Sequence, residues 1–383
     1  MSSISPFQRT RDLLSNAKAT EDWIDLSIGA PRHNTPEIIK DVLNNNFDKF
    51  KNYPSANTSN YFGNNLSKWI TNRFNLNTTN IQDNILPISG SREGIFYGSL
   101  LATKLKSDKS ILIMPDPFYP VYATAGQYTS KKVFTVSVQK DDNYLINLEK
   151  IPNEVWSDTI AFYLCSPSNP QGTIANDDYL ENLYEKSQKF NFIIISDECY
   201  SEIYRSKAPN SILKISEKND FKNILSFNSL SKRSNAPGLR SGYVMGDINI
   251  IREFFNLRNV AAPTVPTPIQ IASETLWGDE GHVIENRKLY NEKFDAFYAT
   301  LDKKFNFQIP DGGFFAWLNI SDFGSDESVT LKLWESGVKV IPGSYLSLNT
   351  DEDSDSRKFI RIALVGDNHE ILRATKIINK VMN

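Results

Sequence analysis

Lys232 lies in a polar run whose residue types can hold an aldehyde cofactor as an imine. The run extends from Ser229 to Gly242, and it places the lysine three residues after a serine and ahead of Arg240 in a glycine-containing turn. Most lysines are charged surface residues, so the interpretation depends on the flanking hydroxyl and guanidinium groups, which suit a phosphate. The sequence therefore indicates that Lys232 is a candidate amine nucleophile.

A second chemistry shares part of this pattern. Ser229 and Lys232 match the Ser-x-x-Lys spacing of penicillin-binding acyl enzymes, in which the serine is the nucleophile. The Ser-Asp-Asn and Lys-Thr-Gly companions of those enzymes are absent from the sequence. The imine chemistry is therefore favoured over hydrolysis.

An apolar run from Phe192 to Ser196 delivers Asp197 to the end of a predicted strand. A carboxylate at such a place can stabilise a proton on a pyridine nitrogen. Tyr200, three residues further on, can reach an oxygen on the same ring. An aspartate after a strand is also a common helix cap, and that alternative stays open.

Two further motifs suit an anion and an aromatic ring. Ser91 directly precedes a helix predicted to start at Arg92, so the free backbone amides of the first turn and the serine hydroxyl can hold a phosphate. An ordinary helix cap explains the same residues. Tyr119 follows a strand in a proline-rich run that fixes its ring at the ligand edge of the sheet, with a buried core aromatic as the alternative.

Asn169 and Arg361 are two further candidate functional residues. Asn169 follows a predicted strand, although Asn-Pro with a nearby glycine is also a common turn. Arg361 interrupts an apolar run from Phe359 to Val365, and a charged residue there needs a partner. That partner is either a substrate carboxylate held by two hydrogen bonds or a carboxylate of the protein in a structural salt bridge.

Short apolar runs alternate with helical patterns, which predicts an α/β fold with a mostly parallel sheet covered by helices on both faces. Ligands bind at the carboxyl ends of the strands in such sheets, and the motifs above fall there. The predicted strands are Ile111–Met114, Lys132–Val136, Thr159–Leu164, Phe192–Ser196, Ile224–Phe227 and Ser241–Met245, with helices at Arg92–Lys106, Asp177–Phe190 and Ile248–Asn259. A small α+β region follows, with a helix at Gly281–Phe305, a strand at Gly313–Ile320, a helix at Ser328–Ser336, strands at Val338–Ile341 and Phe359–Val365, and a terminal helix.

Composition narrows the class of protein. The 383 residues, 40% of them hydrophobic, can build one large core and a smaller second domain. The net charge of −3 offers no basic surface for nucleic acid, and no apolar run approaches the ~18 residues of a membrane helix. The polar start from Met1 to Asp12 lacks a secretory signal, and Cys165 and Cys199 are typical of buried, reduced thiols. We expect a cytoplasmic protein without a nucleic-acid partner, a membrane partner or a bound metal.

Together the motifs resemble the class I aminotransferases, which use pyridoxal 5′-phosphate (PLP) on the fold known as type I. The resemblance covers nearly the whole chain. It implies a large PLP-binding domain at residues 46–279, and an N-terminal arm and small C-terminal domain formed by residues 1–45 and 280–383.

The resemblance also implies roles for single residues. Lys232 is expected to bind PLP and act as the base, Asp197 to face the ring nitrogen, and Tyr200 to reach the ring oxygen. The other expected contacts are Asn169 at the ring oxygen, Tyr119 at the ring face, Ser91, Arg92, Ser229 and Arg240 at the phosphate, and Gly29, Asn169 and Arg361 at the substrate carboxylate.

Tyr53 is expected to cross to the phosphate of a partner subunit, which implies a homodimer with shared active sites. The sequence departs from the family at two places. The segment after Tyr53, from Ser55 to Asn65, is a few residues longer than usual, and Gln171 stands where the family usually has threonine.

Within the family, the resemblance is strongest to the N-succinyldiaminopimelate aminotransferases of bacterial lysine biosynthesis. It implies a ping-pong reaction that moves the amino group of N-succinyl-LL-2,6-diaminopimelate to 2-oxoglutarate, with Arg32 or His33 as candidates for binding the distal acidic end. Acetylated diaminopimelate, acetylornithine, aspartate and aromatic amino acids are alternative donors, and a PLP β-lyase is an alternative reaction. A transcription regulator on the same fold would carry a DNA-binding extension, and none is visible before Leu26.

Overall fold

Strand β5 (Thr159–Cys165) is buried at every position, as expected for the centre of a parallel sheet that is covered on both faces. The computed structural model describes residues 5–54, 62–78, 80–262, 264–349 and 351–383. β5 belongs to a seven-stranded sheet in the order β2-β8-β7-β6-β5-β3-β4, in which β8 runs antiparallel to both neighbours and the others run parallel. The other strands are β2 (Ile85–Ile88), β3 (Ile111–Asp116), β4 (Lys132–Ser137), β6 (Ile193–Asp197), β7 (Ile224–Ser229) and β8 (Gly242–Gly246).

The six strands predicted for this region are confirmed, and β2 is an additional strand that the sequence did not predict. β2 contains Pro87, a residue that argues against a strand in the middle of a sheet. It lies at the edge of the sheet, which is where a proline within a strand is tolerated.

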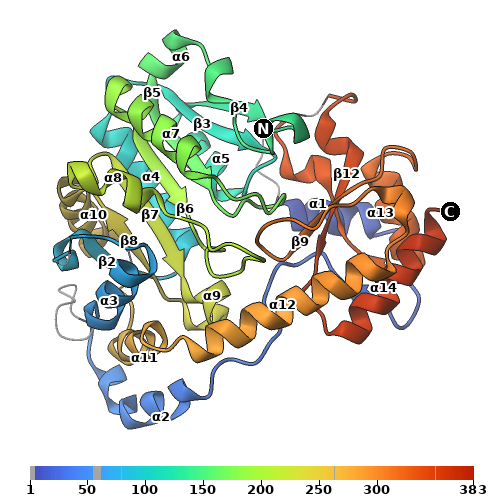
Figure 1. The fold of residues 1–383 in the computed structure, drawn as a ribbon, viewed down its shortest axis with the longest axis horizontal. Helices are drawn as coiled ribbons and strands as arrows, with labels where there is room; N and C mark the ends of the chain where they lie inside the picture. The colour runs from blue at the N-terminus through green and yellow to red at the C-terminus, as the bar shows by residue number, and fades with distance from the viewer. Residues whose placement is uncertain (1–4, 55–61, 79, 263, 350) are drawn as a thin grey trace.

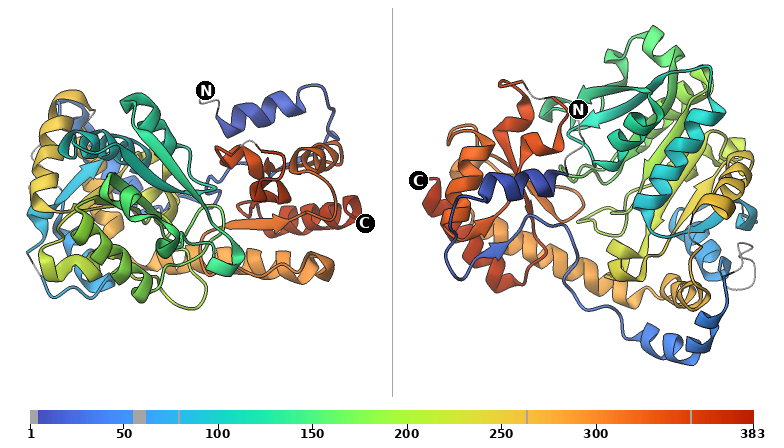
Figure 2. Two further views of the ribbon diagram at one scale, coloured as in Figure 1. Left: turned by 90° about the horizontal axis from the view of Figure 1, so that it is seen from above. Right: turned by 180° about the vertical axis from the view of Figure 1, so that it is seen from behind.

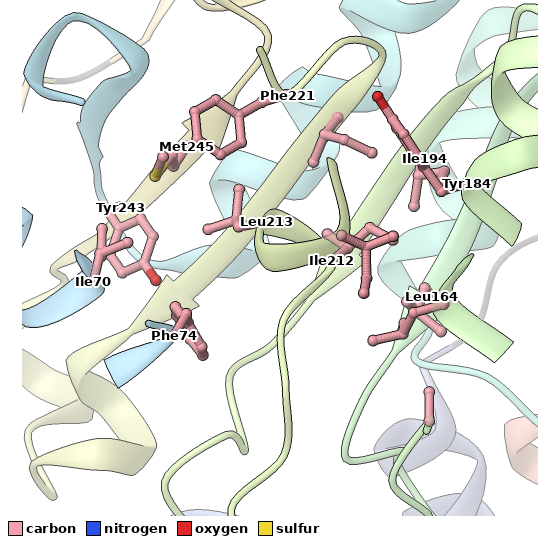
Figure 3. Packing of buried hydrophobic residues seen from close by; sticks show 14 of the residues in the cluster. Ile70, Phe74, Leu164, Tyr184, Ile194, Ile212, Leu213, Phe221, Tyr243 and Met245 are labelled. Carbon is pink, nitrogen blue, oxygen red and sulfur yellow. The ribbon is translucent and has the colours of Figure 1, made fainter. Parts of the chain in front are cut away.

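Helices cover both faces of the sheet (Figure 1). The helices of this region are α3 (Asn64–Arg73), α4 (Ser91–Leu105), α5 (Val121–Thr129), α6 (Asn153–Ser157), α7 (Asp177–Phe190), α8 (Ile212–Ser216), α9 (Leu230–Arg233), α10 (Ile248–Ala261) and α11 (Thr267–Trp277). Helix α2 (Ile38–Asn45) packs against α11 rather than on the sheet. Neighbouring residues of β5 enter different hydrophobic clusters, Leu164 with α3, α7 and α8 and Tyr163 with α4, α5 and α10. Figure 3 shows part of the first cluster, in which Tyr243 of the sheet lies beside Ile70 of α3, and Ile212 of α8 lies on the side of Leu164.

A second lobe is built around an antiparallel sheet in the order β11-β12-β9, beside a parallel pair formed by β1 and β10. The N-terminal arm belongs to this lobe, and Figure 2 shows it in blue against the orange and red C-terminal elements. The elements of the lobe are α1 (Pro6–Leu14), β1 (Ile24–Asp25), β9 (Phe315–Asn319), α13 (Asp326–Glu335), β10 (Val338–Lys339), β11 (Ile341–Pro342), β12 (Phe359–Ala363) and α14 (Asn368–Val381).

Helix α12 (Gly281–Thr300) runs from α9 and α11 to α14 and so spans both lobes (Figure 1). The prediction that this helix continues to Phe305 is wrong at its end. Leu301 is extended, and the side chain of Asp302 accepts a hydrogen bond from the backbone of Lys304 to begin a separate 3-10 turn. Within the described residues, no helix combines the length and the apolar character that crossing a membrane requires.

Candidate active site

The carboxyl ends of three neighbouring parallel strands meet at one edge of the large sheet. The register pairs Cys165 of β5 with Asp197 of β6, and Asp197 with Phe227 of β7. The loop after β5 carries Asn169, and β7 leads directly into α9, which carries Lys232. These polar residues therefore lie at the edge where such sheets bind ligands.

The carboxylate of Asp197 is buried and accepts two hydrogen bonds. Oδ2 accepts one of 2.8 Å from the hydroxyl of Tyr122, and Oδ1 accepts one of 3.3 Å from the backbone amide of Cys199. Burial raises the pKa of Asp197, and the two hydrogen bonds and the nearby Lys232 partly offset that rise. β6 ends at Asp197 and is followed by a turn, so the aspartate does not cap a helix.

The amine of Lys232 is half-buried and faces aromatic rings. Nζ donates a hydrogen bond to the carbonyl oxygen of Gly29, and it lies 5.0 Å from the ring centre of Phe314 and 6.0 Å from that of Tyr200. Burial lowers the pKa of Lys232 to about 8, and the positive charge of Arg361 acts in the same direction. A lysine in water has a pKa of about 10.4, so this amine gives up its proton far more readily.

Arg361, on β12, is buried and has no ion-pair partner within the described part of the chain. Nη1 donates to Oδ1 of Asn169 at 3.3 Å and Nη2 to the carbonyl of Ser27 at 2.9 Å, while Nε has no partner. The guanidinium lies 4.4 Å from the ring centre of Phe315, and burial lowers the pKa of Arg361 to about 10. The geometry thus contains no structural salt bridge and leaves a donor open for a ligand.

The start of α4 and the side chain of Arg240 lie side by side. Helix α4 begins at Ser91, and no side chain caps the backbone N–H groups of its first turn. Nη2 of Arg240 donates to the carbonyl of Ser89 at 2.9 Å, and a Cβ on Gly90 would overlap the same nitrogen. A helix N-terminus beside a guanidinium suits an anion.

Arg92 and Tyr119 join this group through a hydrogen bond. Nε of Arg92 donates to the Tyr119 hydroxyl at 2.7 Å, and the Tyr119 ring meets Tyr122 edge to face at 5.7 Å between centroids. Tyr119 is only partly buried and its hydroxyl is hydrogen-bonded, so it is not simply an aromatic residue of the core.

Ser229 is buried, and its Oγ donates to the Ser241 carbonyl at 3.1 Å. This setting does not suit the serine nucleophile of an acyl enzyme.

Three residues named from the sequence lie apart from this group or are engaged elsewhere. Tyr53 is fully exposed, and residues 55–61 after it lie outside the described residues. Arg32 bonds to a carboxylate of α14 at 3.2 Å, and Nδ1 of His33 lies 2.8 Å from Oδ1 of Asn286. The side chains of Arg32 and His33 are therefore already bound within the chain.

Tyr122 and Phe314 contact the site but had no role assigned from the sequence. Tyr122 lies three residues after Tyr119 in the same proline-rich run, so helical spacing was a usable signal. Phe314 has no comparable signal, because its contact with Lys232 joins the second lobe to the first.

A Ser-His-Asp arrangement includes Ser234, which lies two residues after Lys232 in the sequence. His282 Nε2 is 2.8 Å from Oγ of Ser234, and its Nδ1 is 2.5 Å from Oδ2 of Asp279. Ser234 is completely buried, whereas a serine nucleophile has to be reached by its substrate. The arrangement therefore ties the chain after Lys232 to the start of α12.

Residues 21–378 match the model of the family described as aminotransferase class I and II. The chain belongs to this family. Among its relatives, the LL-diaminopimelate aminotransferase of Maridesulfovibrio salexigens is 28% identical over 94% of this chain and 92% of that protein. A crystal structure of an aminotransferase from Neisseria meningitidis has a TM-score of 0.90 at 32% identity and covers 99% of this chain and 98% of its own. A probable N-succinyldiaminopimelate aminotransferase from Thermus thermophilus shares the fold, with a TM-score of 0.84 at 22% identity over 98% of this chain and 100% of its own.

As a class I aminotransferase, the protein depends on PLP, and it has the α/β fold expected from its sequence. The chemistry of the residues fits that cofactor. A buried carboxylate, Asp197, lies near an amine whose pKa is lowered, Lys232, and a helix start beside Arg240 offers donors for a phosphate.

Proposed function

We propose that this aminotransferase moves the amino group of N-succinyl-LL-2,6-diaminopimelate to 2-oxoglutarate in ping-pong order. The observation that carries the catalytic part is the presence, in one site, of Lys232 with a lowered pKa and the buried carboxylate of Asp197. A diaminopimelate donor is supported by the name of the Maridesulfovibrio relative, and the N-succinyl form by the sequence resemblance described above.

The cofactor would be held mainly by its ring nitrogen, ring oxygen and phosphate. When bound, PLP withdraws electrons from the substrate and carries the amino group between the two half-reactions. Asp197 would keep a proton on the ring nitrogen, because a carboxylate favours a nearby positive charge. The remaining proposed contacts are Tyr200 and Asn169 at the ring oxygen, Tyr119 at the ring face, and Ser91, Arg92, Ser229 and Arg240 at the phosphate.

Lys232 is the proposed base. Its Nζ takes the proton from the α-carbon of the donor and returns a proton later in the same half-reaction. Because burial lowers its pKa to about 8, a useful fraction of the amine is uncharged near neutral pH. The ring of Phe314 beside the amine limits its contact with water.

Arg361 is the proposed binding group for the α-carboxylate of the donor. Its planar fork can form two parallel hydrogen bonds with a carboxylate, and its Nε is buried without a partner. Asn169 lies within hydrogen-bond distance of Nη1 and would share the carboxylate. Gly29 would border the bound carboxylate, because the ring of Phe315 lies beside both Gly29 and the Arg361 guanidinium. The same ring leaves no room for a side chain at Gly29.

We further propose a cytoplasmic homodimer in which Tyr53 of each chain reaches the phosphate of the other. The complete exposure of Tyr53 in the single chain supports this assignment, since a large aromatic side chain is usually covered. The two free cysteines support a reducing compartment. The proposed large domain comprises residues 46–279, and residues 1–45 and 280–383 form the arm and small domain.

A panel of amino donors, each supplied with 2-oxoglutarate, tests the substrate. We expect N-succinyl-LL-2,6-diaminopimelate to give the highest kcat/KM, measured by glutamate release. A higher value with free or acetylated diaminopimelate, acetylornithine, aspartate or an aromatic amino acid would replace it as the donor. Pyruvate release without an acceptor would instead indicate a β-lyase.

The role of Lys232 is tested by substitution. Lys232→Ala should abolish transamination and the visible colour of the PLP-loaded protein, and borohydride should attach the cofactor to Lys232 in the unaltered protein. Lys222→Ala, which changes an exposed lysine, is the matched control. Full transamination by Lys232→Ala would show that another group is the base.

A further inference from the structure

Helix α12 presents three buried side chains to His33. Asn286, Tyr290 and Lys293 are spaced by four and three residues, so they lie on one face of the helix. Asn286 and Lys293 approach the two ring nitrogens of His33, and the Tyr290 ring lies 4.6 Å from the imidazole ring between centroids. Asn286, Tyr290 and Lys293 have no role in the function described so far.

Asn286 connects His33 to the backbone of Lys232. Its amide nitrogen donates to the carbonyl oxygens of Lys232 at 3.1 Å and Arg233 at 3.3 Å, which uses both of its hydrogens. A reversed amide would place an oxygen against two carbonyl oxygens, so the orientation is fixed by these contacts. The amide oxygen therefore faces Nδ1 of His33, and Nδ1 must carry the proton of the neutral ring.

Lys293 connects His33 to the second lobe. Its Nζ lies 2.5 Å from Nε2 of His33 and donates to the carbonyl of Val365 at 3.2 Å. Lys293 is 5% exposed and makes no ion pair with the described residues. Val365 lies two residues after β12, the strand that carries Arg361.

We propose that His33, Asn286 and Lys293 form a clamp that positions Lys232 relative to the strand of Arg361. His33 is the central positioning residue, since its two ring nitrogens join the contact toward Lys232 to the contact toward the second lobe. These contacts form a closed ring. Nζ of Lys232 donates to the carbonyl oxygen of Gly29, and Gly29 lies four residues before His33 on the same segment. This inference rests on the proposed role of Lys232.

The clamp needs a neutral His33. The charged groups around it are Lys293 from α12 and Arg32 on its own segment, while Asp367 and Glu370 at the start of α14 act on Lys293. Burial lowers the pKa of His33 and Lys293 lowers it further, against the effect of the Asn286 hydrogen bond. The clamp therefore stays closed at neutral pH. Once acid protonates Nε2, it faces the ammonium of Lys293 and the contact is lost.

Three substitutions break the clamp at separate contacts. His33→Asn keeps a donor for Asn286 and loses the acceptor for Lys293, whereas His33→Gln keeps an acceptor at the distance of Nε2 and loses the donor. Lys293→Met removes the ammonium while filling its space. Lys288→Met changes an exposed lysine on the same helix and is the matched control.

The readout is the amine of Lys232 in the cofactor-free protein. Its acetylation rate by acetic anhydride is followed against pH by peptide mass spectrometry. Opening the clamp lets water reach the amine, so we expect the midpoint of the profile to rise by about half a pH unit or more in all three variants, a threefold change in the ratio of free to protonated amine. Lys288→Met should leave the midpoint unchanged. Unchanged midpoints in the three variants, or an equal shift in the control, would overturn the clamp.

Two further measurements keep the outcome unambiguous. If a variant fails to fold, the tautomer of His33 in the unaltered protein tests the clamp instead, because the clamp requires the neutral Nδ1–H form. The tautomer is read from the ¹⁵N shifts of histidine-labelled protein, in which only three histidines give signals. The opposite tautomer would overturn it. Failure of the proposed function is recognised separately, since borohydride would then attach the cofactor elsewhere while the Lys232 midpoint still responded to the clamp variants.

Discussion

The hydroxyl of Tyr122 donates a 2.8 Å hydrogen bond to Oδ2 of Asp197, and both side chains are buried. A hydrogen bond to a charged group contributes about 1.5–3 kcal/mol. The bond therefore stabilises the ionised carboxylate at a place where burial alone would favour its protonated form. Tyr122 therefore supports the charge of the aspartate that it contacts.

Tyr122→Phe should raise the pKa of Asp197 further, because it removes a donor that favours the carboxylate. The role proposed for Asp197 needs the ionised form, so the acidic limb of the kcat profile should move to higher pH, and kcat at neutral pH should fall by about tenfold or more. Tyr128→Phe, on the same helix but exposed, is the control.

Asp197→Ala should fold normally and lose nearly all turnover. Unchanged turnover in that variant would refute the proposed role of the carboxylate.

Arg361→Lys should keep a positive charge and lose the planar fork. We expect kcat/KM for the donor to fall by about 10²–10³, since a single ammonium cannot reproduce two parallel hydrogen bonds. Arg252→Lys, at an exposed position on α10, should change nothing. Steady-state kinetics at several donor concentrations measure the effect, and a variant as active as the unaltered enzyme would show that the carboxylate binds elsewhere.

Gly90→Ala should weaken PLP binding. Gly90 has φ +89°, a conformation that other residues adopt at a cost, and the added Cβ would displace the Arg240 guanidinium. Gly238→Ala is the matched control, because a Cβ there meets no atom within 4 Å. Spectroscopic titration of the cofactor-free proteins should give a dissociation constant raised about tenfold or more for Gly90→Ala alone. Equal constants for both variants would place the phosphate away from Arg240.

Lys293→Met should remove a pH dependence of stability. Burial lowers the pKa of Lys293 to about 8, whereas in the unfolded chain it is about 10.4. The unfolded state therefore holds more protons between these values, and the free energy of unfolding rises with pH from about 8 to about 10. Two to three pKa units correspond to about 3 kcal/mol, and below pH 8 that cost is present in full.

Urea unfolding of the cofactor-free proteins from about pH 7 to about pH 10 checks this prediction. The unaltered protein should gain stability over that interval relative to Lys293→Met, and the variant should be at least as stable at neutral pH. Lys288→Met should follow the unaltered protein. Parallel curves for the unaltered protein and Lys293→Met would mean that Lys293 does not change its charge on folding.

The sequence predicted the elements whose signals are local. β5 and β6 are continuous apolar runs, and the motifs around Asp197 and Lys232 lie directly after strands, so their position at the sheet edge followed from the alternation of strands and helices. β2 was missed because Pro87 argues against a strand without revealing that the strand is at an edge.

Contacts between distant segments could not be predicted in the same way. The carbonyl of Gly29 meets Lys232, and His33 meets Asn286, yet each partner lies in a different element and neither pair has a spacing that marks it. Similarly, whether Arg361 is bound to an internal carboxylate depends on what surrounds β12, and only packing shows that a backbone carbonyl and an amide oxygen lie there.

The pairing of β1 with β10 has a consequence for synthesis. Ile24 pairs with Val338, and the amide of Ala363 donates to the carbonyl of Leu26. A ribosome makes the arm long before these partners, so the arm cannot dock while residues 85–246, which form the large sheet, are being made. The contact between the carbonyl of Gly29 and Lys232 therefore joins segments that are far apart in the order of synthesis.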